Sequence, residues 1–329
     1  FQGFVGDSIA ISFSAEDTLV ADTTHFDFRA AAILPFFTQL VVDTVGPPPR
    51  REWRMREIAV DYLNGIRWAA DRLAKAGYNV EINLYDEIAD SLGVYSWGVE
   101  NVVGMDVVMG PLQQSSLSKS MRTVEKTGAE HIILTRVNPG LLTRSDHLRS
   151  VLPADQYTVD VLIVDILKNH PTDNIIFLMA GGGDAQLEAH FLEKFPLHPL
   201  AYDSLLADTM TFDTVMGAKN SIGSLPQKLK FYDRNVIVSL ASRRSRSMIS
   251  NMQMAVQVDD STDIYVYANS DLKELGFIDI PFLERTRTTI PQSGIIDYGD
   301  SLVVEAFKMY RNVYDTDPPE YAVRAHDAL

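Results

Sequence analysis

The stretch from Asp106 to Pro139 constrains the fold of this chain more than any other. Val107, Val108 and Met109 form a short apolar run without polar alternation, which is typical of a strand covered on both faces. A Gly-Pro turn ends that run, residues 115–126 carry an apolar helical stripe, and residues 131–134 are a second apolar run. This order predicts one βαβ unit of a parallel sheet.

A polar loop joins the first strand of this unit to its helix, and it contains Gln113, Gln114, Ser115 and Ser116. The loop follows the carboxyl end of a parallel strand, where open α/β sheets bind ligands. We therefore take it as the first candidate binding loop.

The same alternation of strands and helices continues along the chain. Four strands, at 29–35, 79–85, 107–109 and 131–134, alternate with helices at 53–76, 96–103 and 115–126. After a helix at 155–169, four more strands, at 174–180, 198–202, 235–240 and 263–268, alternate with helices at 185–194, 211–218 and 245–256. A helix at 300–314 follows. The sequence therefore predicts an α/β fold of two doubly wound, Rossmann-like lobes.

Composition excludes several classes of partner and chemistry. The chain has 29 basic and 44 acidic residues, a net charge of −15, which argues against a nucleic-acid partner. Arginines form two local clusters, and we interpret both as solvated turns beside helix ends. The first arginine cluster is Arg50, Arg51, Arg54 and Arg56, and the second arginine cluster is Arg243, Arg244 and Arg246. The absence of cysteine excludes disulfides and thiolate chemistry.

Motifs of enzymes and cofactor sites are missing from the sequence. The loop GGGDAQ places Gln186 where the dinucleotide fingerprint needs its third glycine. None of the seven histidines forms a pair with metal-ligand spacing, and no G-x-S-x-G elbow occurs. We therefore expect no enzyme activity, no cofactor and no metal.

Four segments together resemble the type I periplasmic binding protein superfamily, the branched-chain amino-acid and amide receptors. They are AAILPF (31–36), YLNGIRWAADRLAKAGYNVEINLYD (62–86), VVMGPLQQSSLSKSMRTVEKTGAEHIILT (107–135) and DYGDSLVVEAFKMYRNVYDTDPPEYAVRAHDAL (297–329). Within the superfamily the chain looks most like the Bacteroidetes branch of envelope lipoproteins fused to LysM domains, although no LysM repeat is visible here.

The resemblance implies two lobes joined by crossovers, with a ligand clamped between them. It assigns residues 28–148 and 295–329 to lobe 1 and residues 149–294 to lobe 2, and leaves residues 1–27 as a linker or docked segment. The family's closing segment is absent after residue 329, so the C-terminal end is expected to be incomplete. Matched by position, the implied ligand residues are Gln114, Ser115, Ser116, Thr135 and Arg136 in lobe 1, and Tyr157, Asp184 and Ser242 in lobe 2.

Two loops depart from the family pattern. Lobe 2 has GGGD after its first strand, where an aromatic and a small polar residue are usual, and Arg136 stands where small hydroxyl residues are usual. Arg136 either recognises an acidic ligand through a bidentate pair or fills the cleft. These departures favour a non-enzymatic interaction or scaffold module of the cell envelope.

Two other functions stay open: a solute receptor for an amino acid, small peptide or wall fragment, and a regulator of peptidoglycan synthesis. The expected partners are an envelope protein or peptidoglycan, with a small-molecule ligand as the alternative. The resemblance implies a periplasmic location with outer-membrane association. No apolar run reaches the roughly 18–20 residues of a membrane span, and any signal peptide or lipid anchor is expected to lie outside residues 1–329.

Overall fold

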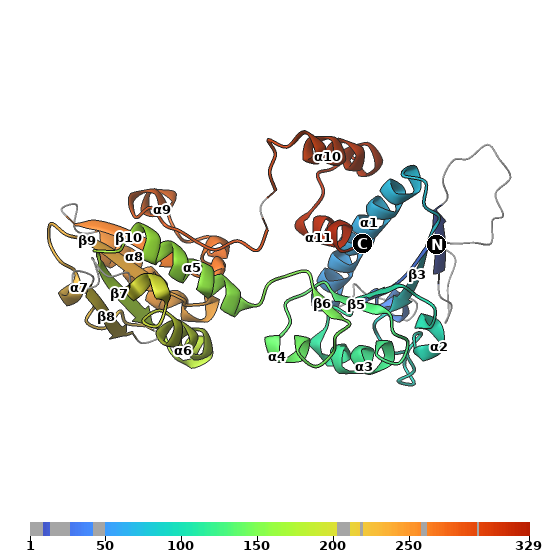
Figure 1. Cartoon of the computed structure of the whole chain (residues 1–329), viewed down its shortest axis with the longest axis horizontal. Coiled ribbons are helices and arrows are strands. Elements are labelled where there is room, and N and C mark those ends of the chain that lie inside the picture. The colour runs from blue at the N-terminus through green and yellow to red at the C-terminus, as the bar shows by residue number, and fades with distance from the viewer. Residues whose placement is uncertain are drawn as a thin grey trace. The chain divides into compact units, whose positions relative to one another are not determined.

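A computed structural model describes residues 9–13, 27–41, 50–202, 211–217, 220–257, 262–294 and 296–329 (Figure 1). The chain divides into two compact units. The first unit is Phe1–Leu152 with Ile296–Leu329, and the second unit is Pro153–Ile295. Each has its own sheet and its own core.

The first unit is built on a six-stranded sheet in the order β1-β3-β2-β4-β5-β6. Its strands are β1 (Ile9–Phe13), β2 (Phe28–Leu34), β3 (Val80–Asp86), β4 (Val107–Met109), β5 (Glu130–Ile133) and β6 (Leu148–Ser150). All pairs are parallel except β1 with β3. The helices of this unit are α1 (Arg50–Lys75), α2 (Val99–Val102), α3 (Gln114–Val124), α4 (Pro139–Leu142), α10 (Ser301–Tyr314) and α11 (Glu320–Ala328), with a 3₁₀ turn at Thr38–Val41.

Strand β2 is buried on both faces, which explains its unbroken apolar sequence. Ala30, Ala32 and Leu34 pack with α1 and α11 residues on one face, while Ala31 and Ile33 pack with residues of α2 and α3 on the other. Since successive side chains of a strand point to opposite faces, one strand contributes to both cores. The unit is therefore a three-layer α/β structure.

Helix α11 packs so closely on α1 that only glycine fits at the crossing. A Cβ added at Gly65 would lie 2.0 Å from the carbonyl oxygen of Ala322. Aromatic contacts flank this point: the ring centroids of Tyr62 and Tyr321 are 5.3 Å apart, and those of Trp68 and His326 are 4.0 Å apart. The end of the chain is thereby part of the first unit's core.

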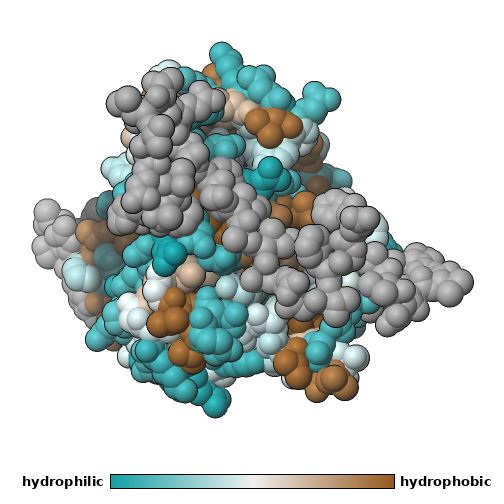
Figure 2. Space-filling model, turned by 90° about the vertical axis from the view of Figure 1, so that its right-hand side faces the viewer, coloured by the Kyte–Doolittle hydropathy of each residue, from teal (hydrophilic) through white to brown (hydrophobic). Residues whose placement is uncertain are grey.

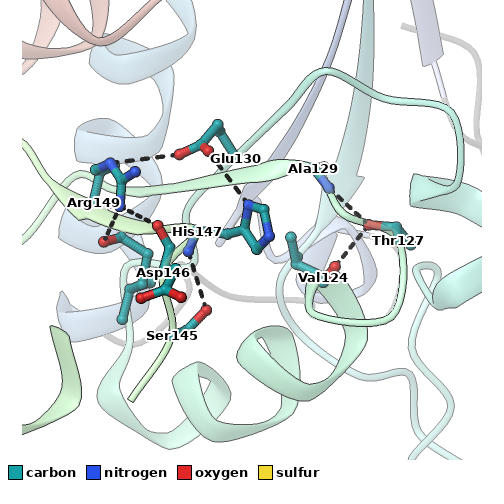
Figure 3. A network of polar contacts seen from close by, with 9 residues as sticks. Val124, Thr127, Ala129, Glu130, Ser145, Asp146, His147 and Arg149 are labelled. Carbon is teal, nitrogen blue, oxygen red and sulfur yellow. Dashed lines mark hydrogen bonds and ion pairs between the residues drawn. The ribbon is translucent and has the colours of Figure 1, made fainter. Parts of the chain in front are cut away.

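A polar network lies at the amino ends of β5 and β6 (Figure 3). Glu130 accepts from His147 Nδ1 at 3.4 Å and pairs with Arg149 Nε at 3.5 Å. Thr127 completes the turn before β5 by donating to the Val124 carbonyl at 2.7 Å. These contacts tie the edge strand β6 to β5, at the end of the sheet opposite the candidate binding loop.

The second unit has a four-stranded parallel sheet in the order β10-β9-β7-β8. Its strands are β7 (Asn174–Met179), β8 (Thr211–Met216), β9 (Arg234–Ser239) and β10 (Asp263–Ala268). Its helices are α5 (Asp155–Asn169), α6 (Ala185–Lys194), α7 (Leu225–Lys228), α8 (Arg246–Gln257) and α9 (Ile280–Arg285), with 3₁₀ turns η2 (Gly182–Asp184), η3 (Pro199–Tyr202), η4 (Arg243–Ser245) and η5 (Ser270–Glu274). One face of β7 packs on α5 and α6 and the other on α8.

Both sheets share one order of parallel strands. Numbered along each unit, it is 2-1-3-4, with a fifth strand in the first unit. In this flavodoxin-like order the connections diverge between strands 1 and 3, and the crevice beyond their carboxyl ends is the usual ligand site. The switch points are therefore at the ends of β2 and β4 in the first unit and of β7 and β9 in the second.

Three predicted elements were wrong or too long, and part of a predicted linker is a strand. Residues 211–218 were predicted as a helix, but Thr211–Met216 is an edge strand, which suits its β-branched Thr211, Thr214 and Val215. Residues 198–202 were predicted as a strand but form the 3₁₀ turn η3, since Pro199 has no N–H for a ladder. The helix predicted at 96–103 shrinks to Val99–Val102. Ile9–Phe13, within the predicted linker, is the antiparallel strand β1; apart from Asp27, the rest of residues 1–27 lies outside the described residues.

Where residues are coloured in Figure 2, hydrophilic ones lie between separate hydrophobic patches. None of the helices in the described ranges is long and apolar enough to cross a membrane. Large apolar side chains that are exposed include Leu92, Leu197 and Tyr232.

The Gly65–Ala322 contact predicts a large effect of one added methyl group. Alanine in a helix is favoured over glycine by about 1 kcal/mol, but forcing a side chain into a packed contact costs about 1–3 kcal/mol or more. Because the contact is with rigid backbone, we expect Gly65→Ala to lower the free energy of unfolding of the first unit by about 2 kcal/mol. Urea unfolding followed by tryptophan fluorescence measures it, since Trp53, Trp68 and Trp97 all lie in this unit.

Val60→Ala is the control, because Val60 lies on the exposed side of the same helix at 42% exposure. It should change the free energy of unfolding by less than about 0.5 kcal/mol. A Gly65→Ala protein as stable as the wild type would mean that α11 does not pack on α1 as described.

Candidate functional site

The candidate binding loops lie at the two switch points. In the first unit they are the segments after β2, β4 and β5, and in the second unit those after β7 and β9. Backbone N–H groups that leave the end of a buried strand need partners. The protein groups that accept hydrogen bonds from these N–H groups determine which N–H groups remain available to a ligand.

A buried histidine holds the loop after β4 in place. Gly110 has a φ of +90°, and a Cβ there would lie 2.1 Å from the Ile33 carbonyl oxygen, so only glycine fits. The Gly110 carbonyl accepts a hydrogen bond from His131 Nε2 at 2.8 Å. Since a carbonyl can only accept, His131 is the Nε2–H tautomer. Burial lowers the pKa of His131 to about 4, so the ring is neutral at physiological pH.

A buried glutamate takes the next two amides of the same loop. Glu87 has no exposed surface, and its carboxylate oxygens accept from Leu112 N at 2.8 Å and Gln113 N at 2.9 Å. The hydroxyl of Ser116 also bonds to this carboxyl group. Burial raises the pKa of Glu87 to about 7 against the opposing effect of these three hydrogen bonds. Ser116, one of the predicted ligand residues, therefore points its hydroxyl at Glu87 inside the protein.

Asp86 satisfies the amides after β2 in the same way. Its carboxylate accepts from Phe36 N at 3.1 Å, from Phe37 N at 3.3 Å and from both Thr38 N and Thr38 Oγ1 at 2.8 Å. The two adjacent carboxylates at the end of β3 therefore occupy the amides on both sides of the first unit's switch point. A ligand's own carboxylate cannot use those amides.

Further polar side chains near the first unit's switch point come from two adjacent loops. Gln114 and Ser115 are exposed in the first turn of α3, and Thr135 and Arg136 are half-buried after β5. The structure brings the loops together, since Gln114 Nε2 donates to the Arg136 carbonyl at 3.4 Å. The Thr135 carbonyl lies 3.4 Å from the Ser150 hydroxyl, which donates at 2.8 Å to the Leu152 carbonyl.

In the second unit, Asp184 and Ser242 lie side by side. Asp184 is 6% exposed, and its Oδ2 accepts from Ser242 N at 3.2 Å and from Ser245 Oγ at 2.9 Å. Asp184 therefore ties the loop after β7 to the loop after β9. Tyr157 stands apart in the first turn of α5, is 60% exposed, and has no hydrogen bond to either residue.

Glu188 repeats in this unit the role of Glu87. It is 3% exposed, and it accepts from Ala180 N at 2.6 Å and Gly181 N at 3.0 Å. Burial raises its pKa. Gly181 and Gly182 follow with φ of +66° and +60°, a backbone conformation that favours glycine.

The described residues contain no group of three or more histidine and acidic side chains that could hold a metal ion. His190 Nε2 forms a hydrogen bond with Asp160 Oδ1 at 2.7 Å.

The sequence analysis did not identify four side chains that organise these loops: Asp86, Glu87, His131 and Glu188. For two of these residues, the sequence contained a pattern that could have predicted the role. Asp86 and Glu87 are consecutive acids directly after an apolar strand, which is the place where carboxylates meet free loop amides. Glu188 and His131 looked like an ordinary helix residue and an ordinary strand residue.

Comparison with known proteins places the fold. No family model matches the chain, and no curated protein matches it either. Among solved structures, a protein of Rhodospirillum rubrum named for a branched-chain amino acid ABC transporter is similar, with a TM-score of 0.60 and 12% identity over 92% of this chain and 81% of its own. An ABC transporter substrate-binding protein of Desulfitobacterium hafniense has a TM-score of 0.55 at 13% identity, and its complex with Leu has 0.52 at 12%, both with the same coverage.

These likenesses establish the two-lobed fold of type I periplasmic binding proteins for this chain, as the sequence predicted. The two Desulfitobacterium structures are described as ABC transporter substrate-binding proteins.

The Gly110–Gln113 loop predicts two opposing effects of pH on stability. The unfolded chain loses the Glu87 proton near pH 4.5, while the folded chain keeps it to about pH 7, so this contribution falls as pH rises through that interval. The unfolded chain protonates His131 near pH 6.5, while the folded chain resists protonation to about pH 4, so this contribution falls as pH drops. Each reaches roughly 3 kcal/mol, because a tenfold change in proton affinity is about 1.4 kcal/mol.

We expect the two contributions to offset each other in the wild type, and single variants to separate them. Glu87→Gln should lose stability more steeply than the wild type from pH 6.5 down to pH 4. His131→Gln should lose it more steeply as pH rises from 4.5 to 7. Urea unfolding by tryptophan fluorescence at four pH values gives the slopes, and parallel slopes for the two variants would contradict the assignment.

Proposed function

We propose that this protein binds a small solute, and that loops at the carboxyl ends of the sheet strands supply the ligand contacts. The observation that carries the proposal is the grouping of polar residues there without catalytic chemistry: Gln114 beside the Thr135–Arg136 loop, and Asp184 beside Ser242. The similar substrate-binding proteins, one in complex with Leu, support this function over a purely structural one.

The ligand class that fits best offers several hydrogen-bonding groups, such as an amino acid, a small peptide or a cell-wall fragment. Exposed amide and hydroxyl groups of Gln114 and Ser115 offer hydrogen bonds without charge. The location that follows from this function is the periplasm, and an ABC transporter is the partner class that the similar proteins suggest.

A thermal-shift screen tests the function. A ligand that binds only the folded form at 100 times its dissociation constant stabilises it by about 2.7 kcal/mol. We expect at least one member of a library of amino acids, amides and peptidoglycan fragments to raise the melting temperature. Failure of every compound, together with the absence of any co-purifying solute in native mass spectrometry, would refute solute binding.

A matched pair of serines locates the contact in the first unit. Ser115 and Ser118 are both exposed on α3, but only Ser115 is in its first turn beside Gln114. Ser115→Ala should weaken binding of the screened solute roughly fivefold, the effect of about one hydrogen bond, and Ser118→Ala should leave it unchanged. Calorimetric titration measures both, and equal affinities would remove Ser115 from the site.

An interaction or scaffold role in the cell envelope is the second candidate. It is favoured by the internal use of the first unit's loop amides by Asp86 and Glu87, which leaves fewer donors for a solute. Association with peptidoglycan or the outer membrane, a lipid anchor, kinship with the LysM-fused branch and regulation of peptidoglycan synthesis belong to this candidate. Crosslinking in cells followed by membrane fractionation tests it, and recovery of a free monomer alone would count against it.

A further inference from the structure

The second arginine cluster lies at the second unit's switch point, on η4 and the start of α8, and follows β9. It consists of Arg243, Arg244 and Arg246. The interpretation of this cluster as a solvated turn beside a helix end does not account for its position at the switch point. All three side chains are exposed, in a protein whose net charge is −15. A local cluster of positive charge therefore lies where the fold places ligands.

The three arginines have different surroundings. The Arg246 guanidinium lies over the Phe277 ring at 4.6 Å. The backbone N–H of Arg243 donates to Asp271 Oδ2 at 3.4 Å. Arg244 instead reaches across to the loop after β7, where its Nη1 lies 3.0 Å from the position of a Cβ on Gly183. No hydrogen bond or ion pair joins its guanidinium to any residue in the described ranges.

Glycine at position 183 leaves the space that the Arg244 side chain uses. The preceding loop amides, Ala180 N and Gly181 N, are taken by Glu188, but those of Gly182 and Gly183 have no partner among the described residues. A guanidinium beside two amides is a donor set that suits an oxyanion. In the first unit, Asp86 and Glu87 occupy the amides of Phe36, Phe37, Thr38, Leu112 and Gln113.

We propose that Arg244, with the amides of Gly182 and Gly183, binds the anionic group of the solute, a carboxylate or a phosphate. This inference rests on the proposed solute-binding function and adds the charge and the orientation of the ligand. The anionic group of the ligand contacts the loops after β7 and β9 of the second unit.

Calorimetry on the full chain tests the site with acids and their neutral analogues. One arm compares amino acids with their C-terminal amides, and the other compares sugar phosphates with the free sugars. One of the two comparisons matches the anionic group of the natural ligand. In that comparison the wild type should bind the anion roughly 10- to 100-fold more tightly than the analogue without the charge, the typical effect of a charge-assisted contact.

Arg244→Gln should remove that preference while leaving affinity for the neutral analogue unchanged, and Gly183→Ala should reduce it by crowding the guanidinium. Arg246→Gln is the matched control and should bind like the wild type, because its partner is the Phe277 ring. Circular dichroism of each unliganded variant confirms that it is folded.

Three results would overturn the assignment: an Arg244→Gln protein that keeps the preference, an Arg246→Gln protein that loses it equally, or a wild type that binds anion and neutral analogue alike. Each of these leaves solute binding intact. A wild type that binds none of the compounds in either arm refutes solute binding itself, and the anion site with it.

Discussion

The binding face of each unit depends on a buried carboxylate that accepts hydrogen bonds from the backbone amides after a strand. A parallel strand that is covered on both faces ends in backbone amides that neither ladder nor water satisfies. Glu87 supplies the missing acceptor in the first unit, and Glu188 supplies it in the second. Each carboxylate fixes two successive amides, and so the course of a loop, before any ligand arrives.

This solution has a chemical consequence for recognition. Amides at the end of a strand can hold an external anion or an internal one, but not both. In the first unit Asp86 and Glu87 have taken them, which leaves neutral side chains such as Gln114 exposed. In the second unit the glycine loop keeps two amides beside Arg244. The two units have the same strand order, yet they offer a ligand different chemistry.

Much of the fold could be predicted because burial imposes a local pattern. The apolar runs of β2, β4, β7 and β9 and the stripe of α1 were found within a few residues of their bounds. The prediction was wrong at Thr211–Met216, an edge strand whose apolar spacing resembles a helix turn. It was also wrong at η3, where a short apolar segment next to a proline gives no decisive period.

The sequence by itself determined the α/β class, the two series of strands and the polar loops at their carboxyl ends, because periodicity and turn residues are local properties. Only the tertiary structure decided which of those polar groups remain accessible. Ser116 turns inward to Glu87, Asp184 joins two loops, and Arg244 crosses to Gly183. Such contacts join residues tens of positions apart, so they follow from strand order and packing, which no local pattern contains.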